Sequence, residues 1–343
     1  MKKILFTLGL VVAHTAAALS FSDVLSAAPS RPDAVSAQLR LINAESTMLR
    51  TEADPLALRI DRLQAGQAAE LAGVELRQAR LTAIADLAEA YGNVLVAHLG
   101  QQLAADGLDL AQSGLQIAEI RFANGSATQL DLRDAQVAAD EAAAGLQTAG
   151  SALRLAVSNL EGMIGETVDP EQLEPLPVGQ LPALPDLDAV LSAALSVPQL
   201  LQVEHGLELA TAAVEMLDPS YASAAQIENA RTQLETTEQL ASEARRGIQR
   251  MARNLHLTAQ NALTSLEVER DAHANAAERH EFERQRLDGG LISEIAFRQS
   301  ALQLRQAELS LLQAESAALT ELFRLSAGSL VGLSGPLGQL GDR

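Results

Sequence analysis

The chain has 343 residues, a formal net charge of −19 at pH 7 and no cysteine; 48% of its residues are hydrophobic but only 2% are aromatic. The missing cysteine excludes disulfides, thiolate metal sites and a cysteine nucleophile. The negative charge disfavours nucleic acid as a partner, because phosphates repel it. The acidic residues are spread along the chain, which is typical of a solvated helix surface; an acidic pore lining is the alternative.

Residues 1–18 have the pattern of a secretory signal peptide. Lys2 and Lys3 precede a ten-residue apolar run, and Ala16 to Ala18 form an A-x-A cleavage site. A helix needs ~20 apolar residues to cross a bilayer, so this run is too short, and no later uncharged stretch approaches that length. We therefore predict export from the cytoplasm, a mature chain that starts at Leu19, and no membrane-spanning helix.

An apolar fraction made mainly of alanine and leucine favours long packed helices over sheets. In the first half, proline and glycine signals predict a helix over residues 32–50 that starts at a proline, and a break at Asp54 and Pro55. A very long helix follows over residues 67–122, then a tight turn at Gly125 and a returning helix over residues 128–164. Two short helices stacked end to end would match the long one.

The second half repeats these signals when the chain is shifted by about 165 residues. The corresponding predicted helices cover residues 198–217, 225–287 and 293–331, with a break at Asp218 and a turn at Gly289 and Gly290. Such a repeat indicates a tandem duplication.

The predicted domains follow from this duplication. After the signal peptide come a first helical repeat over residues 19–165, a connector over 166–185, a second repeat over 186–332 and a tail over 333–343. The connector contains prolines that forbid a regular helix and favour an extended chain: Pro170, Pro175, Pro177, Pro182 and Pro185.

The first long helix carries apolar residues at heptad spacing on two offset seams, which indicates a helix packed between two neighbours, as in a closed ring. An ordinary antiparallel bundle with a broad apolar face is the alternative. The seams consist of Leu103, Leu110 and Ile117, and of Leu108, Leu115 and Phe122.

The residues around the first glycine turn resemble the repeated tip motif of the TolC family of outer-membrane efflux ducts. The resemblance covers nearly the whole mature chain, and the turn motif recurs at the second glycine turn. It implies a homotrimer in which six hairpins form a twelve-helix periplasmic tunnel, docked on a membrane-fusion adaptor that couples it to an inner-membrane pump. The matching positions are Arg121, Phe122, Gly125, Thr128, Asp131, Leu132 and Ala135.

The resemblance also implies where partners bind. In that family the glycine turns lie at the periplasmic mouth and contact the adaptor, so the predicted docking residues are Gly125, Ser126, Ala127, Gly290, Leu291 and Ile292. Asp131 and Asp134 match positions where some members place carboxylates that narrow the tunnel mouth. The alternative is that Asp131, with Thr128, forms a capping box and that Asp134 is a surface residue; Ser293 with Glu294 can act as a cap in the second half.

One departure concerns the two breaks, where family members carry the strands of an outer-membrane barrel. Residues 56–61 offer one short alternating stretch and the second break offers none, whereas a spanning strand needs ~9–11 residues. We therefore expect an all-α chain of tandem long antiparallel hairpins, a TolC-like α-barrel protomer with the β-barrel segments nearly absent. Its association with the outer membrane is then expected to be indirect, through another protein.

Enzyme chemistry is not predicted. The chain has no G-x-S-x-G, phosphate-loop or H-E-x-x-H motif. His273 and His280 are ~10.5 Å apart along a helix, too far to share a metal unaided, so we predict no cofactor and no metal. The predicted function is a component of an efflux or type I secretion system, located in the periplasm or outer membrane. The alternative is a periplasmic coiled-coil scaffold that has kept the fold and lost transport.

Overall fold

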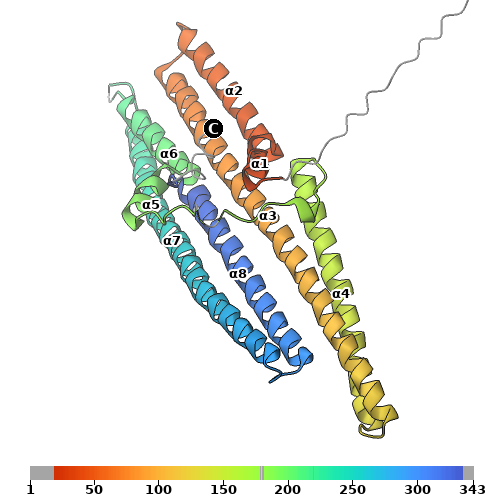
Figure 1. The fold of residues 1–343 in the computed structure, drawn as a ribbon. Helices are drawn as coiled ribbons and strands as arrows, with labels where there is room; N and C mark the ends of the chain where they lie inside the picture. The colour runs from red at the N-terminus through yellow and green to blue at the C-terminus, as the bar shows by residue number, and fades with distance from the viewer. Residues whose placement is uncertain (1–18, 178, 180, 219, 335–343) are drawn as a thin grey trace, which may run out of the picture.

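The computed structural model describes residues 19–177, 179, 181–218 and 220–334, so the predicted signal peptide lies outside the described residues. Within these ranges the chain is helical apart from turns and the connector, and it forms no strand beyond an isolated parallel bridge between Leu19 and Leu173. Among the helices described there, none is both long enough and apolar enough to cross a membrane. The expected fold class, an all-helical chain of long antiparallel hairpins, is confirmed (Figure 1).

The first repeat begins with two short elements and continues with three helices. Proline occupies the start of the second helix, where its missing N–H removes no hydrogen bond. The long helix starts earlier than residue 67, because the carboxylate of Asp61 accepts the N–H of Leu58 at 3.1 Å and caps its first turn. The elements are α1 (Phe21–Leu25), η1 (Ala28–Ser30), α2 (Pro32–Ala53), α3 (Arg59–Ala123) and α4 (Gln129–Ile164).

The second repeat has the same order of elements. Both long helices have 65 residues and both returning helices have 36, and their starting residues, 59 and 224 or 129 and 294, are 165 positions apart. The predicted domain boundaries are not tested by this correspondence. The elements are α5 (Leu187–Ala193), η4 (Ala194–Ser196), α6 (Pro198–Glu215), α7 (Ala224–Asp288) and α8 (Glu294–Ser329).

Four helices form one row in the order α7, α8, α3, α4, with α2 and α6 lying along the upper parts of the long helices (Figure 1). Helix α3 therefore packs between α8 and α4, as its two seams predict. The seam residues are partly buried except Phe122, whose side chain is 43% exposed. The outer helices α4 and α7 make no extensive contact with each other, so the row is open at both edges.

The connector crosses the row at mid-height largely as extended chain, and it contains the 3-10 turn η2 (Pro170–Gln172). Here the largest apolar cluster forms, since side chains from α1, α3, α4, α8 and the connector meet. Phe21 contacts the ring of Tyr91 edge-on at a centroid distance of 5.3 Å. The cluster includes the fully or nearly fully buried Val24, Leu25, Leu87, Val94, Leu160, Leu319 and Phe323.

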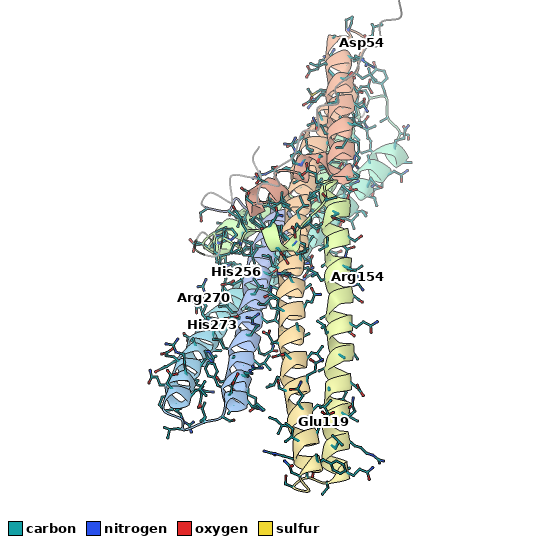
Figure 2. The ribbon with its side chains drawn as sticks, turned by 45° about the vertical axis from the view of Figure 1, so that its right-hand side comes forward. Asp54, Glu119, Arg154, His256, Arg270 and His273 are labelled. Atoms are coloured by element: carbon teal, nitrogen blue, oxygen red, sulfur yellow. The ribbon has the colours of Figure 1, made fainter. Side chains whose placement is uncertain are left out.

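Tyr91 of α3 and His256 of α7 lie at corresponding positions of the two repeats and make corresponding contacts. The Tyr91 hydroxyl donates to the carbonyls of Glu174, at 2.6 Å, and Leu19, at 3.3 Å. The His256 Nε2 atom lies 3.1 Å from the carbonyl of Pro185 (His256 is labelled in Figure 2). Leu19 and Pro185 each precede their short helix, α1 or α5, by two residues. Each long helix thus forms a hydrogen bond with the residue that lies two positions before the first short helix of its own repeat.

Removal of the Tyr91 hydroxyl gives a first testable prediction. Burial raises the pKa of Tyr91, so its hydroxyl stays a neutral donor at physiological pH. We expect Tyr91→Phe to lower the free energy of unfolding by about 1–2 kcal/mol, because the ring packing is kept and two buried hydrogen bonds are lost. Urea denaturation followed by circular dichroism measures this loss. The other tyrosine, Tyr221, is 91% exposed, so Tyr221→Phe is the matched control and should change nothing.

Candidate functional site

The two glycine turns have the same backbone geometry. Gly125 and Gly290 have φ angles of 70° and 67°, in the left-handed region that favours glycine. In the first turn, the N–H of Ser126 donates to the carbonyl of Arg121 at 2.8 Å, and the N–H of Leu291 makes the corresponding 2.8 Å bond in the second turn. These bonds satisfy carbonyls at the helix end in a Schellman-type arrangement, so both long helices reverse within a few residues.

The returning helices are capped differently at the two turns. Thr128 and Asp131 form the predicted capping box, in which the Asp131 carboxylate accepts the Thr128 N–H at 2.7 Å and its hydroxyl at 2.8 Å. Ser293 caps α8 by accepting the N–H of Ala296 at 3.3 Å. The expectation that Glu294 shares this task is wrong, because its carboxylate lies 2.9 Å from Arg298 instead. A capping box needs an acidic or amide side chain three residues after the cap, where this chain has Ala296, so Glu294 at the first helical position pairs with Arg298 instead.

The predicted docking residues differ in exposure. Leu291 is 72% exposed and Ser126 is exposed, whereas Ala127 and Ile292 are half-buried against their own hairpins. The first hairpin places further apolar side chains on its flanks, and the sequence analysis did not predict them as docking residues: Ile120, Phe122 and Leu130 are 61%, 43% and 66% exposed. The sequence feature that could have marked them as docking residues is that they are apolar and lie within ten residues of Gly125.

The two acidic residues of the first tip have different environments. The hydrogen bonds from the Thr128 backbone and side chain lower the pKa of Asp131, so it is ionised as a cap. Asp134 is exposed one turn further along α4. The capping role therefore explains the hydrogen bonds of Asp131 within one chain. The ring of carboxylates at the tunnel mouth, which would contain Asp131 and Asp134, stays a prediction.

Ion pairs join the two hairpins across the α3–α8 contact, and the sequence analysis did not identify them. Arg298 lies 2.9 Å from Asp109, Arg305 lies 3.2 Å from Asp106, and Arg324 lies 2.8 Å from Glu89. The side chains are 37–70% exposed, so each pair contributes little to stability. The three pairs lie at three heights along the contact and are consistent with the register that the packing of α8 against α3 sets.

The two outer helices of the row carry exposed apolar side chains. On α4, Val137 is 53% and Leu155 is 64% exposed; on α7, Val268 and Phe282 are 60% and 59% exposed. Solvated helix edges are normally polar, so these faces are unusual for a chain whose row ends there. Figure 2 shows Arg154 on α4 and Arg270 and His273 on α7, near the same edges.

Residues 57–166 match the family model described as "Outer membrane efflux protein". The resemblance to the TolC family is confirmed. The matched stretch makes up 110 of the 343 residues and contains α3 and α4, the long hairpin of the first repeat. No curated protein sequence matches significantly.

Solved structures share the fold over nearly the full chain. A crystal structure of CusC is 15% identical with a TM-score of 0.62, covering 91% of this chain and 96% of that one. The CmeC outer membrane channel of Campylobacter jejuni is 12% identical with a TM-score of 0.61, covering 92% and 86%. The open state of the MtrE outer membrane channel of Neisseria gonorrhoeae is 14% identical with a TM-score of 0.55, covering 90% and 88%. At these identities the likeness concerns the fold.

Proposed function

We propose that the chain is one protomer of a homotrimeric helical duct in the periplasm, which docks on an adaptor and is thereby coupled to an inner-membrane pump. In this proposal residues 19–165 and 186–332 are the two wall-forming repeats, joined by the connector at 166–185. The duct is a passive path, and the energy for transport comes from the pump.

The observation that carries the proposal is the open row, together with the exposed apolar side chains on both of its outer helices. Helix α3 has a helix on both sides, whereas α4 and α7 each lack a neighbour on one side. A second copy would supply α7 to the free face of α4 and so continue the row. Such a head-to-tail contact uses two different surfaces and generates a ring when the rotation closes. Three copies with four row helices each give the twelve-helix wall that the family resemblance implies.

The glycine tips are the proposed docking surface for the adaptor. They are the farthest points of the chain at one end (Figure 1), and Figure 2 shows Glu119 beside the first of them. Leu291 is exposed at the apex of the second tip, and Leu130 is exposed on the flank of the first. An apolar apex on two rigid hairpins fits a helical hairpin partner that offers an apolar groove.

Cross-linking tests the ring directly, because the chain contains no cysteine. Val137 lies two turns from the start of α4 and Phe282 lies two turns from the end of α7. We expect the double variant Val137→Cys, Phe282→Cys, treated with a bismaleimide cross-linker, to run as covalent dimer and trimer on denaturing gels. The pair cannot join within one chain, since α8 and α3 separate the two edges.

The single variants Val137→Cys and Phe282→Cys are the controls, and neither should give a trimer, because a head-to-tail contact brings the two different positions together. Sedimentation of the unmodified chain provides the second readout. A stable helical monomer at micromolar concentration, without cross-linked trimer, would contradict the duct and favour the scaffold alternative.

A further inference from the structure

A polar cavity of about 450 Å³ lies between α7 and α8, roughly two to three turns from the second glycine turn. His280, one of its lining residues, is nine positions before Gly289, and Figure 2 labels His273 farther up the same helix. None of the residues that line the cavity belongs to the proposed docking tip. Besides two alanines, the lining consists of Asn275, Arg279, His280, Ser300 and Gln303.

These five polar residues stand where the first repeat has apolar or small residues. Their equivalents, 165 positions earlier in the chain, are Leu110, Gly114, Leu115, Ala135 and Ala138. Two of these, Leu110 and Leu115, belong to the apolar seams of α3. The first hairpin forms without any polar side chain at the five positions, so the packing of the second hairpin does not require them either. The polar lining of the cavity therefore calls for a ligand rather than a structural role.

The cavity is lined by an arginine and by no carboxylate, although the chain has a formal net charge of −19. Within the part of the chain that the structure describes, Arg279 has no ion-pair partner. Glu283, four residues on and thus within reach of Arg279, instead accepts two hydrogen bonds from Arg286, at 3.0 and 3.2 Å. Arg284 pairs with Glu281 at 3.1 Å. The Arg279 guanidinium is therefore available to an external anion.

Two contacts fix the orientation of the His280 ring. Its Nδ1 atom lies 2.9 Å from the Ser300 hydroxyl oxygen, and the ring stacks on Phe297 at a centroid distance of 4.8 Å. The Ser300 hydroxyl donates its hydrogen to the carbonyl of Phe297 at 2.8 Å, so its oxygen accepts the N–H of Nδ1. The other ring nitrogen, Nε2, has no hydrogen-bond partner among the described residues. It is the ring atom that a ligand can contact.

A phosphate group suits these partners better than a carboxylate does. Both anions can pair with a guanidinium through charge-assisted hydrogen bonds. The second pKa of a phosphate monoester is about 6, in the range where imidazoles ordinarily titrate, so a phosphate and an imidazole can share one proton near neutral pH. A carboxylate ordinarily titrates about two pH units lower and offers no such proton. The amides of Asn275 and Gln303 can donate to the remaining phosphate oxygens.

We propose that this cavity binds the phosphate group of a phosphorylated solute, with Arg279 as the charge partner and one proton shared between the phosphate and Nε2 of His280. Few other charged groups face the imidazole: Arg279 and Glu283 flank it on α7, and the α8 residues that line the cavity are neutral. The volume of about 450 Å³ leaves room for an organic group beside the phosphate. The inference does not depend on the proposed duct.

Isothermal titration calorimetry with glycerol phosphate at pH 8 tests the site. A phosphate dianion and a neutral imidazole have no proton to share, so we expect the unmodified chain to take up about one proton per phosphate bound. Titrations in Tris and in HEPES, whose heats of ionisation differ, measure this uptake. Arg279→Gln should weaken binding at least about tenfold, because a charge-assisted hydrogen bond is lost. His280→Leu should weaken it similarly and abolish the uptake; leucine is the residue at this position of the first repeat, so the fold accepts it.

Two controls distinguish a phosphate site from general attraction between charges. Arg284→Gln removes an arginine of the same helix that already pairs with Glu281, and its affinity for glycerol phosphate should equal that of the unmodified chain. Sulfate has the shape and the double charge of the phosphate but stays fully ionised, so it should bind the unmodified chain at least about tenfold more weakly at pH 8.

The site is overturned if a folded chain shows no binding heat at millimolar glycerol phosphate, or if binding takes up no proton. Equal affinities of His280→Leu and the unmodified chain contradict it as well. Equal losses for Arg279→Gln and Arg284→Gln indicate attraction to any arginine of the helix and also rule against it. Trimer formation is measured separately by cross-linking, so a chain that cross-links as a trimer but binds no phosphate overturns this inference and leaves the duct standing.

Discussion

Replacing Gly92 by leucine is expected to lower the free energy of unfolding by about 3 kcal/mol or more, because it forces α3 away from α8. A Cβ atom at this position would overlap the Ser316 hydroxyl and come within 2.8 Å of the Ser316 Cβ. The neighbouring Tyr91 is fully buried, as are Leu319 and Leu322 on α8, so neither helix can yield without opening the core. Thermal unfolding by circular dichroism measures the loss.

Three further variants test whether the close approach of the two helices is the cause. Gly107 lies on the same helix, and a Cβ there meets nothing within 4 Å, so Gly107→Ala should be neutral or stabilise by up to about 1 kcal/mol through helix propensity. Gly92→Ala should destabilise despite the same propensity gain, and Ser316→Gly in that background should restore part of the loss. Equal effects of Gly92→Ala and Gly107→Ala would show that the α3–α8 distance is not set by Gly92.

The features that the sequence predicts correctly are determined by a few neighbouring residues. Proline at the start of α2 and α6 marks the helix starts, and the left-handed conformation at Gly125 and Gly290 marks the reversals. Each depends on the backbone restrictions of one residue. Because the second half of the chain repeats the first, each local prediction also applies about 165 residues later. The length and order of the helices could therefore be predicted.

The features that the sequence does not predict depend on contacts between distant segments. Nothing near Tyr91 indicates that its hydroxyl binds the carbonyls of Leu19 and Glu174, because those segments meet only after the connector crosses the row. The ion pair between Arg298 and Asp109 likewise joins segments 189 residues apart, which no local pattern indicates. The repeat offset of 165 residues places Tyr91 and His256 at equivalent positions. Because the two residue types differ, aligning the repeats does not reveal that both bind a carbonyl.

The docking proposal makes its sharpest claim at the second glycine tip. We expect the double variant Leu291→Asp, Ile292→Asp to reduce capture of the adaptor encoded nearest to this gene at least about 100-fold, which corresponds to about 2.7 kcal/mol of binding free energy. Two carboxylates placed in an apolar contact lose their hydration without gaining a partner. Pull-down or cross-linking against the purified adaptor measures the change.

The structure also sharpens the choice of variants for that experiment. Ile292 is half-buried, so its replacement by aspartate alters the turn as well as the surface, whereas Leu291 is 72% exposed and Leu291→Asp alone changes only the surface. We expect Leu291→Asp to weaken capture while circular dichroism and trimer cross-linking stay unchanged. Leu56→Asp with Leu58→Asp, which adds the same two charges at the opposite end of the molecule, is the matched control and should capture the adaptor normally. Unchanged capture by a folded Leu291→Asp, Ile292→Asp trimer would show that the adaptor binds elsewhere, because no other exposed apolar side chain stands at the apex of the second turn.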